Sequence, residues 1–271
     1  MRPSIKFFPH AFEEIDLKVP SAFGATTLRY PVWNTPKLMQ RRNVQVEVDF
    51  YSRIIAPGDI VFDIGAHIGD STLAFAVCSG ITGTVYAFEP NPATFRILSD
   101  RALINSRVTK ISPIPLAVGT MDCHTIFDYG DHWLDNGGFH EKTVFSHGSN
   151  YTVPVRMVEL SSFLKLCSLE LKDIKFIKLD CEGADLNIVE RLIEFEDKVD
   201  LPCIQLELIE FNEKIAARLA ALEATFDIHE LSVDECGDLS CRVFDTDSSD
   251  NQFTKKDLIL VPIHDDTLSL G

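Results

Sequence analysis

Short apolar runs alternate with amphipathic stretches along most of this chain. The runs are bounded by Gly, Pro or Asp and have the length of buried strands, whereas the stretches between them have the helical period. The predicted strands are residues 59–63, 84–88, 111–118, 176–179, 204–208, 226–233 and 258–263, and the predicted helices are residues 46–55, 71–78, 93–104, 160–167, 186–194 and 213–222. Strands that alternate with helices imply a mostly parallel sheet covered on both faces. We therefore expect an α/β fold with a doubly wound sheet that closes in a C-terminal antiparallel hairpin.

Two segments depart from this rhythm. Residues 1–45 are punctuated by prolines and lack a long periodic segment, so we expect an N-terminal lead-in that packs on the core. Residues 46–271 would then form the main domain. Within it, residues 119–156 are rich in glycine and histidine and show no helical period. This composition indicates an irregular insertion of hairpins or a loop that lies as a lid over one end of the sheet.

Charge and cysteine content narrow the class of partner. The chain has 25 Lys and Arg against 41 Asp and Glu, a formal net charge of −16. An acidic surface repels phosphate backbones and anionic lipids, so nucleic acid and membrane are poor partners. No apolar run reaches the roughly 18 residues of a membrane helix, and the N-terminus lacks the pattern of a secretory signal. The seven cysteines have no close pairs, which is typical of reduced thiols in a cytoplasmic protein.

The most informative motif follows the first predicted strand and reads DIGAHIGDST over residues 63–72. Gly65 and Gly69 allow a tight turn and a close approach of the backbone to a ligand. In open parallel sheets, ligands bind beyond the carboxyl ends of the strands. Glu89 follows Gly69 by 20 residues and ends the second strand, where a carboxylate can accept hydrogen bonds from both hydroxyls of a ribose. The motif therefore indicates a nucleoside-binding loop, the alternative being a simple glycine turn whose Asp70 only caps the helix.

The charges around this loop distinguish between nucleoside ligands. A dinucleotide site requires G-x-G-x-x-G, and this chain has His67 and Asp70 at the two later glycine positions. Asp70 would stand where a pyrophosphate binds at a helix N-terminus, and Asp63 adds a second carboxylate. Like charges a few ångströms apart repel by on the order of several kcal/mol, which disfavours an NAD-dependent oxidoreductase. S-adenosylmethionine carries an ammonium and a sulfonium and no phosphate, so it suits this loop far better.

Three segments together resemble the FkbM family of class I, S-adenosylmethionine-dependent methyltransferases, which have a Rossmann-like fold. The segments are FDIGAHIGDST, AFEPNP and FIKLDCEGAD, and the resemblance covers residues 46–220. It implies methyl transfer to hydroxyls of secondary metabolites and sugars. It also implies that the glycine loop lines the methionine end of the cofactor, that Glu89 holds the ribose, and that Pro90 and Asn91 flank the adenine. The expected cofactor-binding residues are Asp63, Gly65, Ala66, His67, Gly69, Asp70, Ser71, Thr72, Glu89, Pro90, Asn91, Val118 and Asp180.

A second acidic cluster, KLDCEGAD over residues 178–185, continues from the predicted strand at 176–179. In a doubly wound sheet this strand end lies beside the glycine loop, so Asp180 should point at the cofactor's methyl group or at the acceptor. O-methylation requires removal of the hydroxyl proton, and Asp180 is the first candidate for the base. His67 is the second candidate, with a main-chain contact or packing as its alternative. Glu182 is a further catalytic candidate, with helix capping as its alternative.

The remaining acidic residues have structural readings. Asp185, at the start of the next helix, is expected to act as a cap. Asp180 and Glu207 end neighbouring strands and could offer oxygens to Mg²⁺, but we expect no metal, because Glu207 can face a backbone or arginine partner instead. We therefore expect an enzyme that uses S-adenosylmethionine to methylate a hydroxyl of a small molecule, secondary metabolite or sugar. A non-catalytic module that binds a nucleoside or S-adenosylmethionine is the alternative in a different class.

Overall fold

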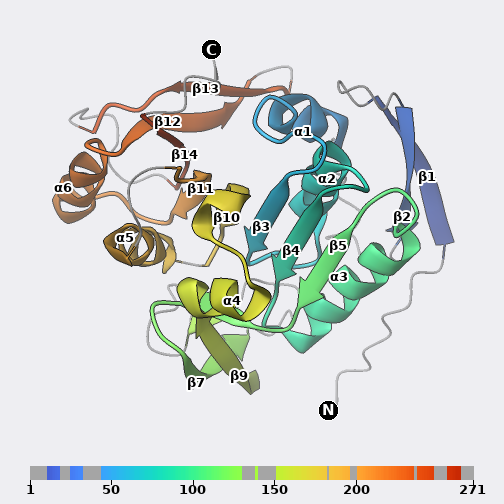
Figure 1. Ribbon diagram of the computed structural model, residues 1–271, viewed down its shortest axis with the longest axis horizontal. Coiled ribbons are helices and arrows are strands. Elements are labelled where there is room, and N and C mark those ends of the chain that lie inside the picture. The colour runs from blue at the N-terminus through green and yellow to red at the C-terminus, as the bar shows by residue number, and fades with distance from the viewer. Residues whose placement is uncertain are drawn as a thin grey trace.

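An eight-stranded sheet runs through the centre of the molecule in the computed structural model (Figure 1). The structure describes residues 11–18, 25–32, 44–129, 138–139, 151–181, 183–195, 200–234, 237–246 and 255–263. The strands of the central sheet are β3 Ile60–Ile64, β4 Thr84–Phe88, β5 Ile111–Ile114, β10 Ile174–Leu179, β11 Cys203–Leu208, β12 Phe226–Val233, β13 Leu239–Val243 and β14 Lys256–Pro262. Their order across the sheet is β13-β12-β14-β11-β10-β3-β4-β5.

The strand directions confirm the expected doubly wound fold. Strands β5, β4, β3, β10 and β11 are mutually parallel, and β14, β12 and β13 continue the sheet with antiparallel pairings. The chain winds from β3 out to β5 and then returns to β10 on the opposite side of β3, so strand order reverses between β3 and β10. Ligands of open α/β sheets bind beyond the carboxyl ends of the strands at such a reversal. The edge strand β13 is the one strand of this sheet that the apolar pattern missed, because its side chains are half-buried or exposed.

Helices cover both faces of the sheet, which explains why its strands are apolar at consecutive positions. The helices are α1 Val44–Tyr51, α2 Asp70–Ser79, α3 Pro92–Ile104, α4 Leu160–Cys167, α5 Asp185–Phe195 and α6 Glu213–Leu222. Successive side chains of a strand point to opposite faces. In β3, Val61 accordingly belongs to the apolar cluster that contains residues of α1 and α2, while Phe62 belongs to the cluster on the other face and contacts Phe163 of α4. A short 3₁₀ helix, Leu171–Asp173, leads into β10.

A smaller four-stranded sheet lies beside the carboxyl ends of the central strands (Figure 1). Its strands are β6 Ala117–Gly119, β7 Cys123–Tyr129, β8 Gly138–Phe139 and β9 Tyr151–Glu159, in the order β6-β9-β7-β8. The predicted strand at 111–118, which prolines were expected to interrupt, divides at Pro115 and Leu116 into β5 of the central sheet and β6 of the small one. The expected insertion contains a regular antiparallel β7–β9 ladder in its described part.

The N-terminal segment contains an antiparallel pair, β1 Ala11–Lys18 and β2 Ala25–Val32, which the proline-punctuated pattern did not indicate. Leu17 and Leu28 are fully buried in one apolar cluster with residues of α1 and α2. The side chain of Asn105, at the end of α3, accepts a hydrogen bond from Arg29 N and donates one to Arg29 O. These contacts join the strand pair to the helical face of the central sheet.

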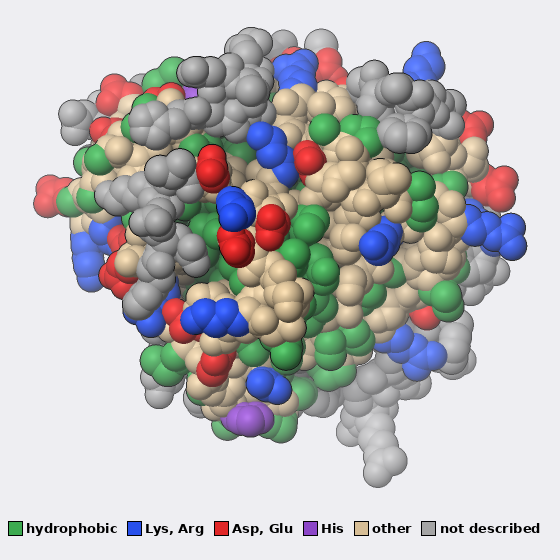
Figure 2. Space-filling model, viewed as in Figure 1, with side chains coloured by type: hydrophobic (Ala, Val, Ile, Leu, Met, Phe, Trp, Pro, Cys, Tyr) green, Lys and Arg blue, Asp and Glu red, His purple; other side chains and the backbone are tan. Residues whose placement is uncertain are grey.

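The surface in Figure 2 shows acidic and basic side chains interspersed over one face of this acidic chain. Within the described ranges, we find no helix that is both long enough and apolar enough to cross a membrane.

Candidate active site

A cavity of about 230 Å³ opens at the carboxyl ends of β3, β4, β10 and β11, where strand order reverses. Its walls come from the central sheet, the glycine loop and the small sheet. The described residues that line it are Asp63, Ile64, Gly65, Ala66, His67, Asp70, Ser71, Glu89, Pro90, Asn91, Leu116, Ala117, Val118, Phe127, Lys178, Asp180, Cys181, Glu207 and Lys255. The sequence therefore predicted most of the wall, and Gly69 and Thr72 are the expected cofactor residues that the structure places outside it.

The glycine loop touches the end of β10 directly. Asp180 N donates a hydrogen bond of 2.9 Å to Ile64 O. Gly65 has φ +80°, and a Cβ added there would lie 2.0 Å from Asp180 O. A side chain at Gly65 is thus excluded by both backbone conformation and space. The expected proximity of the loop to Asp180 is confirmed.

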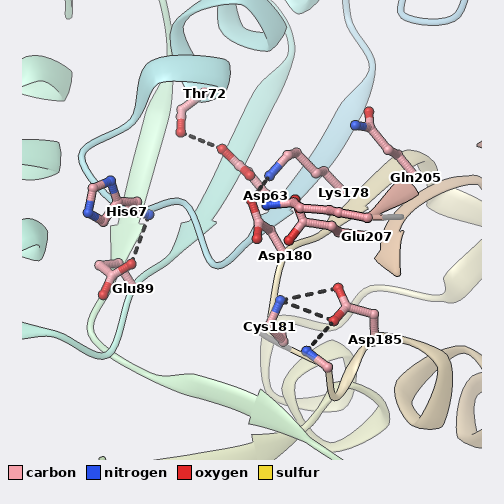
Figure 3. A network of polar contacts seen from close by, with 12 residues as sticks. Asp63, His67, Thr72, Glu89, Lys178, Asp180, Cys181, Asp185, Gln205 and Glu207 are labelled. Carbon is pink, nitrogen blue, oxygen red and sulfur yellow. Dashed lines mark hydrogen bonds and ion pairs between the residues drawn. The ribbon is translucent and has the colours of Figure 1, made fainter. Parts of the chain in front are cut away.

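Glu89 holds the loop from the neighbouring strand end (Figure 3). Its Oε2 accepts a hydrogen bond of 2.8 Å from His67 N, and its Oε1 accepts one of 2.7 Å from Asn91 N. Burial raises the pKa of Glu89 to about 7, against the lowering effect of these backbone donors, and the charge of Asp63 adds to the increase. The backbone N–H of His67 thus makes a main-chain contact, the alternative that the sequence left open for this residue.

The acidic residues of the loop have partners within the protein. Asp63 is 1% exposed, and its Oδ2 accepts a 2.5 Å hydrogen bond from Thr72 Oγ1. Asp70 begins α2, and its Oδ1 lies 2.6 Å from Nη1 of Arg101, a side chain that is 1% exposed. Arg101 therefore offsets the charge of Asp70, which the sequence had counted as uncompensated. The sequence around Asp70 contains no motif that indicates this pairing with Arg101, because Arg101 lies 31 residues away in α3.

Two lysine–carboxylate pairs form the opposite wall (Figure 3). Lys178 Nζ lies 2.8 Å from Asp180 Oδ2, and the lysine side chain is only 10% exposed. Lys255 Nζ pairs with Glu207 Oε1 at 2.5 Å. Sequence reasoning missed both lysines. Lys178 could have been found, because it stands two residues before Asp180, and side chains two apart on a strand share a face.

The turn after β10 is organised by Asp185. Its carboxylate accepts hydrogen bonds from the backbone N–H groups of Cys181 and Gly183, so it holds the turn that leads into α5, and the helix cap expected from the sequence stays a prediction (Figure 3). Burial, together with the charge of Asp180, raises the pKa of Asp185 to about 6, and the same burial raises the pKa of the Cys181 thiol. Glu182, the further catalytic candidate, lies outside the described residues.

The small sheet supplies the apolar part of the cavity. Val118 of β6 is 2% exposed, and Phe127 of β7 faces the same space. Leu116 and Ala117 line it at the junction of the two sheets. Val118 was expected here, whereas Phe127 depends on the fold of the inserted strands and could not be placed from the sequence.

The described residues show no arrangement that favours a metal. No group of three or more His, Cys, Asp or Glu side chains is placed to hold an ion within the described ranges. Asp180 and Glu207 each have one oxygen paired with a lysine ammonium. A cation that bound to both carboxylates would have to compete with these ammonium groups.

Comparison with known proteins identifies the class of this site. Residues 63–239 match the methyltransferase FkbM domain. This span includes the glycine loop, Glu89, the Lys178–Asp180 pair and Glu207, but not Lys255. The chain belongs to the FkbM methyltransferase family. The FkbM match makes this protein a methyltransferase, and S-adenosylmethionine-dependent transfer is the chemistry that the resemblance of its three motifs implied.

Individual relatives are distant. A hexuronic acid methyltransferase, AglP, from Haloferax volcanii is 23% identical over 210 residues, which cover 76% of this chain and 82% of the relative. Among solved structures, a precorrin-6y C5,15-methyltransferase from Geobacter metallireducens aligns with a TM-score of 0.42 and 12% identity, over 84% of this chain and 92% of that one. An S-adenosylmethionine-dependent O-methyltransferase from Thermotoga maritima aligns with a TM-score of 0.41 and 11% identity, over 92% and 77%.

Proposed function

We propose that this FkbM-family protein transfers the methyl group of S-adenosylmethionine to a hydroxyl oxygen of a sugar or another small molecule. The observation that carries the proposal is the cavity at the strand reversal. It brings the glycine loop, the buried carboxylate of Glu89 and the Lys178–Asp180 pair to one space. This arrangement supports a transfer site in which the cofactor half and the acceptor half are adjacent.

The glycine loop and Glu89 fit the cofactor. Because Gly65 has no side chain, the loop can pack against Asp180 at the end of β10 while its backbone lines the cavity. The carboxylate of Glu89 accepts backbone hydrogen bonds from His67 and Asn91 and a side-chain one from Thr94, and the acceptor capacity that remains can take a ribose hydroxyl. We propose that Asp63, Ala66 and the other expected loop residues hold the methionine end. When bound, S-adenosylmethionine supplies an electrophilic methyl group attached to a positively charged sulfur.

The charge of the cavity supports a cationic cofactor over a dinucleotide. Asp70 is compensated by Arg101, so repulsion of a pyrophosphate by Asp70 is weaker than the sequence suggested. Asp63, bound to Thr72, and Glu89 contribute two buried carboxylates at the loop, and His67 occupies a position where the dinucleotide motif needs glycine. An NAD-dependent oxidoreductase is therefore the weaker reading.

The opposite wall fits a small polyhydroxylated acceptor. It combines the ammonium of Lys178, the carboxylates of Asp180 and Glu207, and an apolar side that includes Phe127. Alternating donors and acceptors of this kind can bind the hydroxyls of a sugar ring. The methylated substrate class in the name of the Haloferax relative, a hexuronic acid, supports a sugar acceptor.

Two tasks fall to the protein in such a transfer. It must align the acceptor oxygen with the methyl carbon, which lowers the barrier as effective molarity. It must also receive the hydroxyl proton, for which the sequence named Asp180 first and His67 second. Asp180 has Oδ2 on Lys178, so we propose that this pair orients the acceptor through one ammonium and one carboxylate.

Calorimetry and a transfer assay test the proposal. The purified chain is titrated with S-adenosylmethionine, S-adenosylhomocysteine and NAD, and then incubated with tritium-labelled S-adenosylmethionine and D-glucuronic acid, D-galacturonic acid, D-glucose or D-galactose. We expect the chain to bind S-adenosylmethionine and S-adenosylhomocysteine, and we expect the transfer assay to yield a labelled methyl ether of a sugar. Binding of NAD alone would contradict the proposal, whereas binding without transfer to any acceptor would favour a non-catalytic module.

We also propose the cellular setting and the domain organisation that the sequence suggested. Six described cysteines are free thiols, which supports a cytoplasmic location. Residues 1–45 are proposed as a lead-in, and residues 46–271 as the methyltransferase domain. Burial of Leu17 and Leu28 against the domain supports that division. The acidic surface supports a small-molecule acceptor over nucleic acid or membrane.

A further inference from the structure

Glu207 has one carboxylate oxygen that the fold leaves without a hydrogen-bond partner. Glu207 is the penultimate residue of β11 and is 8% exposed. Its Oε1 pairs with Lys255, while Oε2 is buried and has no hydrogen-bond partner among the residues that the structure describes. A buried oxygen of an ionised group without a partner costs free energy. Such an oxygen is a candidate for binding something that arrives from outside the fold.

The unpartnered oxygen belongs to a cavity-lining residue. Glu207 lines the same space as Asp180, the glycine loop and Phe127, and Figure 3 shows its side chain gathered with those of Asp63, Lys178 and Asp180. Unlike Asp180, whose side chain is 31% exposed and bound to Lys178, Glu207 is almost completely removed from water. A ligand with a hydroxyl group can supply the missing donor.

We propose that Oε2 of Glu207 accepts the hydrogen of the acceptor hydroxyl and takes its proton during methyl transfer. This inference rests on the proposed function and assigns the base to Glu207 rather than to Asp180 or His67. The hydroxyl O–H bond breaks and its proton moves to Oε2, while the oxygen forms a bond to the methyl carbon. The C–S bond breaks and its electron pair stays on sulfur, which becomes neutral.

The surroundings of Glu207 suit a base. Burial, and then the charge of Asp180, raise the pKa of Glu207, while Lys255 opposes the increase. Asp257, which is paired with Glu207 in the β11–β14 ladder, adds to the increase. A carboxylate with a raised pKa is a stronger base at neutral pH than an ordinary one.

Glu207→Gln tests the role with little change in shape, and Glu210→Gln is the matched control. Glu210 stands three residues further along, is exposed and lies outside the residues that line the cavity. Transfer to the best sugar of the panel is expected to fall by about 100-fold or more in Glu207→Gln and to stay within about twofold of the parent in the control. S-adenosylhomocysteine affinity is expected to remain within about twofold in both variants.

Two readouts do not depend on transfer. The urea midpoint of Glu207→Gln is expected to be no lower than that of the parent, because the substitution removes a buried charge that lacks a full set of partners. Calorimetry with MgCl₂ is expected to show no binding to the parent chain. A lower midpoint than in Glu210→Gln would assign Glu207 a structural role and overturn the proposal. Binding of Mg²⁺ by the parent that is lost in Glu207→Gln would assign Oε2 to a metal and overturn it equally.

The outcomes separate the two levels of inference. If the parent methylates a sugar and Glu207→Gln does so at a similar rate, the base assignment is wrong and the proposed function stands. If the parent methylates none of the four sugars, the proposed acceptor class is wrong. The urea midpoint and the Mg²⁺ titration then decide the question for Glu207, with an unlowered midpoint and no Mg²⁺ binding as the supporting result.

Discussion

The guanidinium of Arg101 reaches from α3 to the carboxylate of Asp70 at the start of α2, with 2.6 Å between Nη1 and Oδ1. The arginine side chain is 1% exposed and the aspartate side chain 31% exposed. The pair places a fixed positive charge behind the loop that we assign to the cofactor. It therefore ties the stability of the loop to a helix that follows the next strand.

Breaking this pair should destabilise the fold. Arg101→Met leaves Asp70 without its guanidinium, and we expect the free energy of unfolding to fall by about 2 kcal/mol, less than for a fully buried pair because Asp70 is partly hydrated. Urea unfolding of Arg101→Met, Asp70→Asn and the double variant measures the coupling. Equal and additive losses in the two single variants would show that the two side chains do not stabilise one another.

Cofactor affinity should depend on pH through Glu89. The pKa of this carboxyl is raised to about 7, and ribose hydroxyls donate to its ionised form. Affinity for S-adenosylhomocysteine is therefore expected to fall by about tenfold for each pH unit below 7 and to level off above it. In Glu89→Gln, affinity should be weaker by about 1–3 kcal/mol and flat between pH 6 and 8. Calorimetry over that range measures both, and a parent chain with flat affinity would contradict the role of Glu89.

The same group gives stability a defined pH dependence. Because the pKa of folded Glu89 lies above its ordinary value, its contribution is fully present below about pH 4.5 and is lost as pH rises through about 7. The loss amounts to about 3 kcal/mol at most. The difference in unfolding free energy between the parent and Glu89→Gln, measured by urea at several pH values, should therefore shift in favour of the variant as pH increases. If the difference in unfolding free energy stayed constant with pH, the pKa of Glu89 would not be raised in the folded protein.

Alanine substitutions at Gly65 and Gly80 distinguish the cost of a steric clash from the cost of backbone strain. Both have positive φ, but a Cβ at Gly65 meets Asp180 O at 2.0 Å, whereas a Cβ at Gly80 meets nothing within 4 Å. Gly80→Ala should cost only the conformational strain of its φ 63°, ψ −172° backbone, about 1–3 kcal/mol. Gly65→Ala should cost clearly more in urea unfolding and should abolish binding of S-adenosylhomocysteine. Similar losses in the two variants would mean that β10 can move away from the loop.

Lys178 and Asp180 should act as a unit. Lys178→Met and Asp180→Asn are each expected to lower methyl transfer by about 10- to 100-fold, because either change removes a group that orients the acceptor. The double variant should be no slower than the worse single variant, since the pair is already broken. Affinity for S-adenosylhomocysteine should stay near that of the parent. Lys165→Met, at an exposed site on α4, is the control, and normal transfer by Asp180→Asn would remove the pair from the acceptor site.

Local patterns predicted the parts of this site that local sequence determines. The strand ends, the glycine turn and the position of Glu89 follow from apolar runs and glycine spacing, and the adjacency of Asp180 to Gly65 follows from the doubly wound order. The partners of those residues did not follow. Arg101 is 31 residues from Asp70, and Lys255 is 48 residues from Glu207, so pairing depends on how helices and strands pack rather than on any motif.

The inserted sheet was the hardest part to foresee. Burial alternates along β7 and β9, but the residue types do not follow it: Ile126 is 49% exposed whereas Thr125 is half-buried, so no apolar–polar alternation marks the strands in the sequence. The sequence analysis also missed β1 and β2, because prolines interrupt the N-terminal segment and a two-stranded pair needs few apolar residues. Among the side chains of this pair that the structure describes, Leu17 and Leu28 are the buried ones.

All four strands of the small sheet come from one continuous segment of the chain, whereas the rest of the cavity wall comes from segments far apart in the sequence. The chain leaves the central sheet after β5 and returns to it at α4. The segment between these two points contributes Val118 and Phe127 to the cavity wall. Exchanging the segment between Val118 and Leu160 for that of another family member would therefore remodel the acceptor wall while preserving the loop, Glu89, Val118 and Glu207. The donor-binding framework can in this way serve as a constant platform on which new substrate preferences arise by replacement of one contiguous stretch.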